Sequence, residues 1–413
     1  MRDERRRRFG AHLARLREDA GLSQRKLADR MCRLSGTSSV TRNEVSRWER
    51  GERLPDTWLP AIADAVGAPL DDLERAAAYA RGDDGVRLPG PLANLAELLP
   101  HGAEELEPLQ VAPGRREVGH DAVEALAARV HALRLADDVL TAGDLVAPAF
   151  DELHAAVTLF RESSHVDDVG RALLAQIGEL AQIAGWIASD GGLHAQAERA
   201  YRLGATVARQ AGDAQLLTHV VGSLAYQDAN IGHERDAVDL TEAVIAEAGP
   251  DIHPTARALV HDRLAWAHTR AGQVQPAMRA LGTAHEALTE AAAGGEPAPA
   301  WAYWVTSDEL SLMDARVFTE LRRPLRAVPL LTEIVGRYDT THARELGLYL
   351  SWLAVALTDA NEPEQAATVA ARMLSLNVAS ERITDRRRVV LRRLEAFDDI
   401  AEVRELLAAH PAV

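Results

Sequence analysis

Helical patterns of hydrophobic and polar positions cover most of this chain and fall into two regions. Residues 9–80 contain five short segments with apolar residues every three or four positions. From residue 120 to the end, Ala and Leu dominate, and the alternating β-branched runs typical of strands are missing. Between these regions, prolines and glycines interleave over residues 82–119, which indicates a linker with one short helix at 93–99. The pattern predicts an all-α protein with domains at 1–81 and 120–413.

The sequence TRNEVSRWERG at positions 41–51 predicts a short helix with two different faces. Thr41 followed three residues later by Glu44 is a capping box, in which the two side chains satisfy exposed amides at the helix start. Val45 and Trp48 share one face and are expected in the core, and Gly51 ends the helix where a left-handed residue costs least. The other face carries hydrogen-bonding side chains of the kind that contact base edges in a DNA major groove: Arg42, Asn43, Glu44, Ser46, Arg47 and Arg50.

The flanking segments extend this helix into a larger motif. Before it, Gly21 marks a turn and Ser23 caps a second helix, whose buried face is expected at Leu27, Ala28 and Met31. After it, apolar residues continue at helical spacing at Leu59, Ile62, Ala63, Val66 and Leu73. Together these residues resemble the XRE (Cro-type repressor) helix-turn-helix family over residues 9–80. One departure is that residues 31–40 make a longer connection than the family's usual turn.

The resemblance implies a five-helix, lambda-repressor-like domain that binds a double-stranded DNA operator. Arg42, Asn43 and Arg47 are expected at base edges, with a solvated charged face as the alternative for the two arginines. The remaining DNA contacts are expected at the helix starts and along the phosphate backbone: Ser23, Gln24, Arg25, Thr41, Ser46 and Arg50, with Glu44 taken up by its capping role. Members of the family usually read two half-sites about one helical turn apart, which implies a homodimer.

The charge of the chain is divided unevenly. Residues 1–60 hold 15 Lys and Arg against 9 Asp and Glu, a net charge of +6, whereas the other 353 residues hold 31 against 53, a net charge of −22. A basic head on an acidic body indicates that only the head meets nucleic acid. Lys26 is the only lysine, so an Arg is by itself weak evidence of function here. The charged residues 1–8 are expected to fray, and the Ala- and Arg-rich composition is typical of a high-GC bacterium such as an actinomycete.

The second region repeats itself along the chain. Gly192, Gly232 and Gly272 lie 40 residues apart, and an Ala follows each five positions later. Arg322 and Asn361 roughly continue the register, the first after ten extra residues and the second one residue early. Small residues recur seven positions before each of these turns: Gly185, Ala225, Ala265, Ala315 and Ala354. This pattern resembles the tetratricopeptide repeat, a helix–turn–helix unit, although its period exceeds the usual value of about 34.

The tetratricopeptide resemblance implies an α-solenoid with a concave inner face. At least five units are expected over residues 171–378. Helices at 120–140 and 145–162 form an atypical first pair, and residues 385–409 form a helical cap.

One face of the expected repeats carries an aromatic row. Trp186, Tyr226 and Trp266 stand six positions before their turn glycines. The tetratricopeptide resemblance places this position on the inner face, with polar residues four positions before and after: Gln182, Asp190, Asn230, Asp262 and Arg270. Such a face could bind an extended peptide or a small molecule, or the rings could serve only to pack neighbouring repeats. Regulators with an XRE head and a tetratricopeptide body often bind short signalling peptides in this groove; others use the solenoid for protein partners or dimerisation.

The sequence lacks motifs for catalysis, metal binding and membrane insertion. It contains no Gly-rich phosphate loop, no His-Glu-x-x-His and no Gly-x-Ser-x-Gly motif, and the single Cys32 excludes an intrachain disulfide. No apolar run approaches the ~20 residues of a membrane span, and residues 1–8 are not followed by the apolar segment of a signal peptide. We therefore expect a cytoplasmic protein that is not an enzyme and has no cofactor or metal.

Two functions fit these patterns. The first is a sequence-specific transcriptional regulator whose repeat domain senses a peptide or small molecule and mediates dimerisation. The second is an adaptor, in which the DNA-binding head tethers the solenoid to DNA and the solenoid recruits a protein partner without a small ligand.

Overall fold

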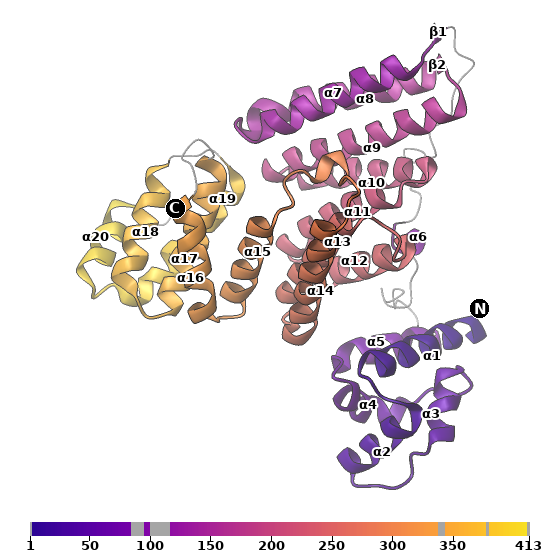
Figure 1. Ribbon diagram of the computed structural model, residues 1–413. Coiled ribbons are helices and arrows are strands. Elements are labelled where there is room, and N and C mark those ends of the chain that lie inside the picture. The colour runs from indigo at the N-terminus through magenta and orange to yellow at the C-terminus, as the bar shows by residue number, and fades with distance from the viewer. Residues whose placement is uncertain (1, 84–94, 100–115, 338–342, 377–379, 411–413) are drawn as a thin grey trace. The chain divides into compact units, whose positions relative to one another are not determined.

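A computed structural model describes residues 2–83, 95–99, 116–337, 343–376 and 380–410 (Figure 1). The chain divides into two compact units, Met1–Pro100 and His101–Val413. The division falls inside the stretch expected to be a linker, most of which lies outside the described residues. The short helix expected there is present as α6 (Leu95–Leu98).

Helices packed around one core form the N-terminal unit, and the five predicted for residues 9–80 are all present. They are α1 (Arg2–Asp19), α2 (Gln24–Ser35), α3 (Arg42–Glu49), α4 (Leu59–Val66) and α5 (Leu70–Arg81), with a 3-10 turn at Asp56–Trp58. Their apolar faces meet in a core that contains Phe9, Leu13, Leu27, Met31, Val45, Trp48, Ile62 and Leu73. Trp48 is 2% exposed, which confirms its expected place in the core.

The first helix begins earlier than the sequence suggested. α1 starts at Arg2, so for residues 2–8 the expectation that the segment frays was wrong. Two contacts hold this segment. Phe9 is fully buried, and the Arg5 guanidinium lies 5.0 Å from the centroid of the Tyr79 ring on α5.

Antiparallel helix pairs make up the C-terminal unit, called here the repeat body. The first pair is α7 (His120–Asp137) and α8 (Ala142–Glu162). Five further pairs follow: α9 (Asp167–Asp190) with α10 (His194–Ala211), α11 (Ala214–Asn230) with α12 (Glu234–Ala248), α13 (Pro254–Arg270) with α14 (Val274–Ala293), α15 (Ser307–Glu320) with α16 (Pro324–Arg337), and α17 (Ala343–Asp359) with α18 (Pro363–Ser375). The cap consists of α19 (Glu381–Leu394), a 3-10 turn at Glu395–Phe397, and α20 (Ala401–Ala409).

The described strands are minor. Residues Arg116–Glu117 (β1) pair in parallel with Ser163–Ser164 (β2), beside the first helix pair. All other regular structure in the described ranges is helical, so the chain is an all-α protein with a stacked, solenoid-like body.

The predicted turn positions share one backbone conformation. The φ angles of Gly192, Gly232 and Gly272 are 75°, 94° and 73°, and those of Arg322 and Asn361 are 51° and 63°. These two are the only non-glycine residues with positive φ in the described part of the chain. The small residues seven positions earlier are buried between paired helices, with Ala225, Ala265, Ala315 and Ala354 all fully covered. The repeat register therefore continues through the two units that lack a turn glycine.

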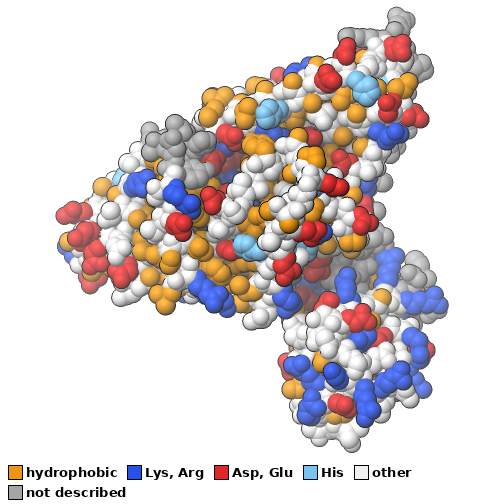
Figure 2. All heavy atoms as spheres, in the orientation of Figure 1, with side chains coloured by type: hydrophobic (Ala, Val, Ile, Leu, Met, Phe, Trp, Pro, Cys, Tyr) orange, Lys and Arg blue, Asp and Glu red, His pale blue; other side chains and the backbone are white. Residues whose placement is uncertain are grey.

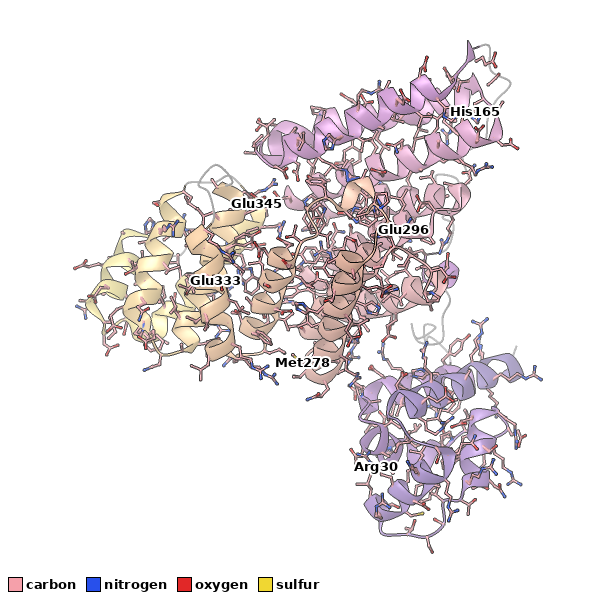
Figure 3. The ribbon with its side chains drawn as sticks, in the orientation of Figure 1. Arg30, His165, Met278, Glu296, Glu333 and Glu345 are labelled. Carbon is pink, nitrogen blue, oxygen red and sulfur yellow. The ribbon has the colours of Figure 1, made fainter. Side chains whose placement is uncertain are left out.

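The ten extra residues fall in a distinct segment between α14 and α15. This segment, residues 294–306, contains a 3-10 turn at Ala300–Ala302 and is called here the strap. Trp301 stacks on His219 of α11, with ring centroids 4.1 Å apart and planes 6° from parallel. Nearer the start of the strap, the Glu296 carbonyl lies 3.3 Å from Nε2 of His253. Figure 3 labels Glu296 in this segment. The strap is thus fastened to the repeat body at two points.

Candidate functional site

The repeat body contains two adjoining cavities, of about 300 Å³ and about 220 Å³. Helices α9, α11, α13, α15, α17 and α19 contribute to both, α7 and the strap add to the walls of the larger, and α10 adds to those of the smaller. Six residues line both cavities and are called here the shared wall: Trp186, Tyr226, Arg316, Leu348, Trp352 and Arg382. Both cavities lie within the repeat body, on whose inner face the sequence predicts the aromatic row.

The rings of the aromatic row contact one another as well as the cavities. Trp186 and Tyr226 stack with centroids 5.7 Å apart, and Tyr226 and Trp266 are 6.4 Å apart. Trp266 is 1% exposed and makes an edge contact with Trp352 at 5.7 Å. Trp186 is only half-buried. Packing between repeats and access to a cavity therefore occur in the same rings, and the two interpretations left open by the sequence do not exclude each other.

Three arginines surround Tyr226. Arg316 donates from Nη2 to the Tyr226 hydroxyl oxygen at 2.7 Å, and Arg382 donates to the same oxygen at 3.3 Å. The Arg263 guanidinium lies 4.3 Å from the centroid of the ring. Burial by itself raises the pKa of Tyr226, but the positive charges of Arg316, Arg382 and Arg263 outweigh it and lower the pKa to about 8.

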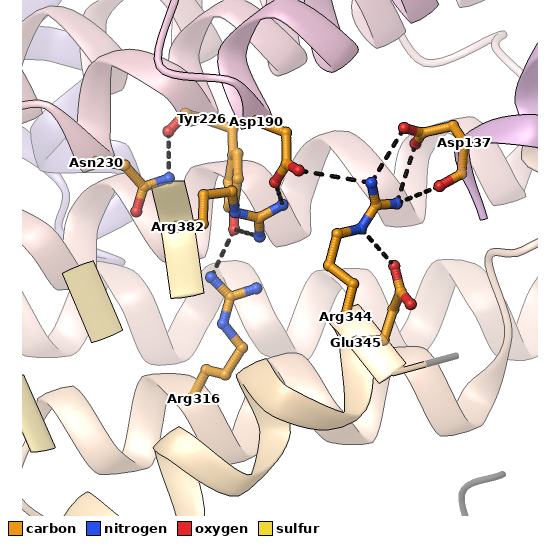
Figure 4. A network of polar contacts seen from close by, with 8 residues as sticks. All are labelled: Asp137, Asp190, Tyr226, Asn230, Arg316, Arg344, Glu345 and Arg382. Atoms are coloured by element: carbon orange, nitrogen blue, oxygen red, sulfur yellow. Dashed lines mark hydrogen bonds and ion pairs between the residues drawn. The ribbon is translucent and has the colours of Figure 1, made fainter. Parts of the chain in front are cut away.

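A network of ion pairs crosses the repeat body beside the shared wall (Figure 4). Arg344 on α17 lies 3.2 Å from the Asp137 carboxylate on α7 and 3.5 Å from that of Asp190 on α9. Arg382 on α19 pairs with Asp190 at 3.3 Å, and Glu345 pairs with Arg344 at 3.1 Å. Burial raises the pKa of Asp137 to about 6, against the lowering effect of the Arg344 charge. These contacts join late helices of the body to its first ones.

The polar residues predicted for the groove have different surroundings. Gln182 lines the larger cavity and donates to the Ser223 hydroxyl at 3.1 Å. Asn230 lines the smaller cavity, but its amide donates to the Tyr226 carbonyl at 2.7 Å and accepts from the Trp266 indole at 3.2 Å.

The charged members of the predicted set divide in the same way. Asp190 and Arg270 line the smaller cavity, and Arg270 also donates to the Ala229 carbonyl at 3.2 Å. Asp262 lines neither cavity; it is 3% exposed and lies 3.8 Å from Arg263. Burial raises the pKa of Asp262 to about 7.

Sequence reasoning missed the arginines that dominate the cavities. These are Arg134, Arg263, Arg316, Arg344, Arg382 and Arg386. The position of Arg316 could have indicated its role. It stands six positions before the turn residue Arg322, the register position that holds the rings of the aromatic row in the earlier repeats. Arg382 and Arg386 belong to the cap, where the repeat register gives no position to compare.

The N-terminal unit orients α3 through its cap and its buried face. The Thr41 hydroxyl accepts from the Glu44 amide at 3.3 Å, and Gly51 ends the helix with φ of 71°. The reciprocal half of the expected capping box was wrong: the Glu44 carboxylate instead pairs with Arg47 at 3.2 Å and lies 3.7 Å from Arg53. Two nearby cations outcompete a single backbone amide for that carboxylate.

A buried ion pair, unseen in the sequence, fixes the end of α3. Arg17 on α1 donates from Nε to the Glu49 carboxylate at 2.6 Å, and the two side chains are 10% and 8% exposed. Gln24, at the start of α2, donates to the other Glu49 oxygen at 2.6 Å. Glu49 thus connects α1, α2 and α3, and it sets the direction of the Gln24 side chain that was expected at a phosphate.

Close backbone packing fixes α3 against α1 as well. A Cβ added at Gly10 would lie 2.3 Å from the Glu49 carbonyl oxygen, so only glycine permits this approach. The long connection before α3 is partly taken up by α2, which extends to Ser35. Val40 is 5% exposed, and its carbonyl accepts from the Cys32 thiol at 3.3 Å, which anchors the remaining loop to the core.

Residues 8–76 match the model of a protein family described as a helix-turn-helix domain. The N-terminal unit is a helix-turn-helix DNA-binding domain. None of the curated proteins compared with the chain matches it.

The helix-turn-helix domain presents α3 with its predicted polar side exposed. Arg42, Asn43, Arg47 and Arg50 are exposed, and Ser46 is half-buried. At the start of α2, Ser23 and Arg25 are exposed, and the Ser23 hydroxyl accepts from the Lys26 amide at 3.2 Å. Figure 2 shows arginine side chains gathered over the visible face of this domain. The surface has the donors and the positive charge that phosphates and base edges require.

Two kinds of feature are absent from the described ranges. No group of three or more His, Cys, Asp or Glu side chains there is arranged to hold a metal ion. Within the same ranges, no helix combines the length and apolar character needed to cross a membrane.

Proposed function

We propose that this protein is a sequence-specific transcriptional regulator whose repeat body senses a ligand and changes the affinity of the helix-turn-helix domain for its operator. The match of residues 8–76 to the helix-turn-helix model is the observation that carries the proposal. The net charge of +6 over residues 1–60 supports contact with DNA by this domain alone.

Arg42, Asn43 and Arg47 carry base recognition in this proposal. Arginine pairs with guanine O6 and N7 and asparagine with adenine N6 and N7, each pair giving roughly 1–3 kcal/mol of discrimination. Ser23, Gln24, Arg25, Thr41, Ser46 and Arg50 position the domain on the phosphate backbone. The regulator acts as a homodimer on two half-sites about one helical turn apart, in the cytoplasm and on the nucleoid.

The cavities of the repeat body provide the sensing part of the proposal. Their volumes lie at or below the lower end of the roughly 300–1,000 Å³ typical of small-molecule sites. A ligand that binds one arrangement of the repeat body better than another shifts the population between DNA-binding and non-binding forms. The tetratricopeptide-like repeats are in this view a regulatory domain.

Selection of bound fragments from a random DNA pool tests the first part. The full chain should enrich a two-fold symmetric site, and the Asn43→Ala, Arg47→Ala double variant should lose it. Arg75→Ala is the matched control on α5, where Arg75 pairs with Asp72 at 2.7 Å, and it should select the same site as the native chain. Equal enrichment by the native chain and the Asn43→Ala, Arg47→Ala variant contradicts the assigned base contacts.

Co-purification of a protein partner distinguishes the adaptor function from ligand sensing. The adaptor function is supported if a protein partner binds the repeat body and no small molecule changes operator affinity. The repeat body would then recruit a partner and not sense a ligand. Sedimentation of the chain as a monomer, both free and on the selected operator, would contradict the proposed dimer.

A further inference from the structure

The shared wall has a composition that points to one class of ligand. It consists of two arginines, three aromatic residues and one leucine, and it contains no carboxylate. The aromatic rings offer flat apolar faces, and the guanidiniums offer planar, positively charged donors. A surface of this kind complements a flat organic molecule that carries a negative charge.

Arg316 is the centre of this surface. Its residue is 8% exposed and lines both cavities. It donates to the Tyr226 hydroxyl and to the Met313 sulfur, its Nε is buried without a hydrogen-bond partner, and it belongs to no ion pair within 4 Å among the described residues. The carboxylates that act on it from farther away, Glu309 and Asp262, are buried groups whose pKa is raised by burial. A buried charge without an opposite charge is costly, and it commonly marks a position where a ligand supplies the counter-charge.

Neighbouring arginines add to this local excess of positive charge. Arg263 has its nearest carboxylate, Asp262, at 3.8 Å, and its guanidinium lies between the rings of Tyr226 and Trp304 at 4.3 Å and 5.9 Å. In the smaller cavity, Arg386 stacks 3.4 Å over the Trp352 centroid, and its Nη2 is buried without a partner. Its Nη1 lies 3.8 Å from the Glu320 carboxylate, and its Nε donates to the Ser351 hydroxyl at 3.0 Å.

Three of the carboxylates that line the larger cavity have partners or surroundings that limit their effect on the shared wall. Asp137 and Glu345 are paired with Arg344 at 3.2 Å and 3.1 Å. Burial raises the pKa of Glu309, which favours its neutral form. Asp137 and Glu345 are therefore engaged with Arg344, and burial disfavours the charged form of Glu309.

We infer that the ligand of the repeat body is a small aromatic carboxylate, whose acidic group binds Arg316 and Arg382 beside Tyr226 and whose ring lies against Trp186 and Trp352. The inference rests on the proposed ligand-sensing function and names the chemistry of its ligand. A carboxylate reaches the two guanidiniums as a bidentate acceptor, which a phenol hydroxyl cannot match. The ion pairs of Arg344 and Arg382 across the body leave a compact cavity, so an extended peptide is the less suitable occupant.

Matched probes test this chemistry on the full chain. The acids benzoate, 2-naphthoate and indole-3-acetate are titrated calorimetrically against benzamide, 2-naphthamide and indole-3-acetamide, with inorganic phosphate as an anion without a ring. At least one acid should bind at one site per chain and at least tenfold more tightly than its amide and than phosphate. Binding of amides as tightly as acids, phosphate binding as tightly as every acid, or no binding by any of the three acids overturns the inference.

Two variants locate the site. Arg316→Gln should weaken binding of the acid at least tenfold, and Arg382→Gln, at a partly exposed position, should also weaken it if Arg316→Gln folds poorly by circular dichroism. Arg372→Gln on the exposed side of α18 is the matched control and should bind as the native chain does. Unchanged affinity in both cavity variants overturns the assignment.

Operator binding measured in the same samples separates this inference from the proposed function. An acid that binds through Arg316 without altering operator affinity leaves the ligand chemistry standing and removes the sensing role. Operator affinity that responds to a peptide, while no acid binds, preserves sensing and removes the aromatic carboxylate.

Discussion

Arg344 and Asp137 lie 207 residues apart in the sequence, yet their side chains form a buried ion pair 3.2 Å long. The side chains are 11% and 7% exposed, and Arg344 also donates to the Asp137 carbonyl. The ion pair joins α17 to α7. It therefore holds the last of the five further helix pairs, α17 with α18, against the first pair, α7 with α8.

Removing Arg344 should destabilise the repeat body. The variant Arg344→Met leaves the buried Asp137 and Asp190 with less compensating charge, and loss of one partner of a buried pair typically costs about 3–5 kcal/mol. Urea unfolding followed by circular dichroism measures the change. Asp137→Asn in the same chain should restore part of the lost stability. A change in the free energy of unfolding below about 1 kcal/mol for Arg344→Met would mean that the ion pair contributes little to holding the repeat body together.

The Arg17–Glu49 pair gives a second prediction, in the helix-turn-helix domain. Glu49→Gln leaves the buried Arg17 guanidinium without its carboxylate, and we expect a loss of about 3 kcal/mol. Operator affinity should fall as well, because Glu49 also orients Gln24. Glu52→Gln is the matched control: its partner Arg50 and Glu52 itself are 59% and 51% exposed, so stability should change by less than about 1 kcal/mol. Similar effects of the two variants would contradict the role given to burial.

Tyr226 should ionise at a lower pH than an ordinary tyrosine. Its pKa of about 8 follows from burial, which raises it, and from the larger opposing effect of the Arg316, Arg382 and Arg263 charges, which stabilise the phenolate. Absorbance at the tyrosinate wavelength should therefore show a step from Tyr226 as pH rises through about 8. Tyr226→Phe should abolish the step, and Arg316→Gln should move it to higher pH. A step that stays in place in Arg316→Gln would show that this charge does not set it.

The left-handed turn residues predict an increase in stability. Arg322 and Asn361 have φ of 51° and 63°, a conformation that costs a residue with a Cβ roughly 1–2 kcal/mol and glycine much less. Arg322→Gly should raise the free energy of unfolding by up to about 1 kcal/mol, and Asn361→Gly by less because Asn tolerates this region. Gly232→Ala, at the equivalent turn with φ of 94°, should have the opposite sign. Thermal unfolding of the three variants compares them.

The helices and turns were predictable because their causes are local. The turn at Arg322 was placed correctly without a glycine, since the buried alanines at 315 and 327 kept their spacing around it. The first pair, α7 and α8, also followed from pattern alone. By contrast, residues 1–8 were expected to fray because their charge suggested solvent, and the contact of Arg5 with Tyr79 lies outside any local pattern.

The charged contacts of both units were not predictable for a different reason. Neither Arg17 with Glu49 nor Arg316 with Tyr226 has a sequence spacing that indicates contact, since each joins helices that meet only in the folded chain. The almost exclusive use of Arg removed the remaining signal, because a buried arginine and a solvated one look the same in this sequence. Asn230 was expected to face a ligand, and its two hydrogen bonds to the aromatic row could be seen only with the helices in place.

The contact between α17 and α7 constrains how the number of repeats can change in evolution. In an open solenoid, a repeat can be duplicated or lost because each unit touches only its neighbours. Here a gained or lost pair between α9 and α16 would carry Arg344 away from Asp137 and Asp190, and Arg382 away from Tyr226. The contacts of α17 and α19 with the first helices of the body therefore constrain the number of repeats. Sequence variation among descendants of this chain should concentrate in side chains and in the strap.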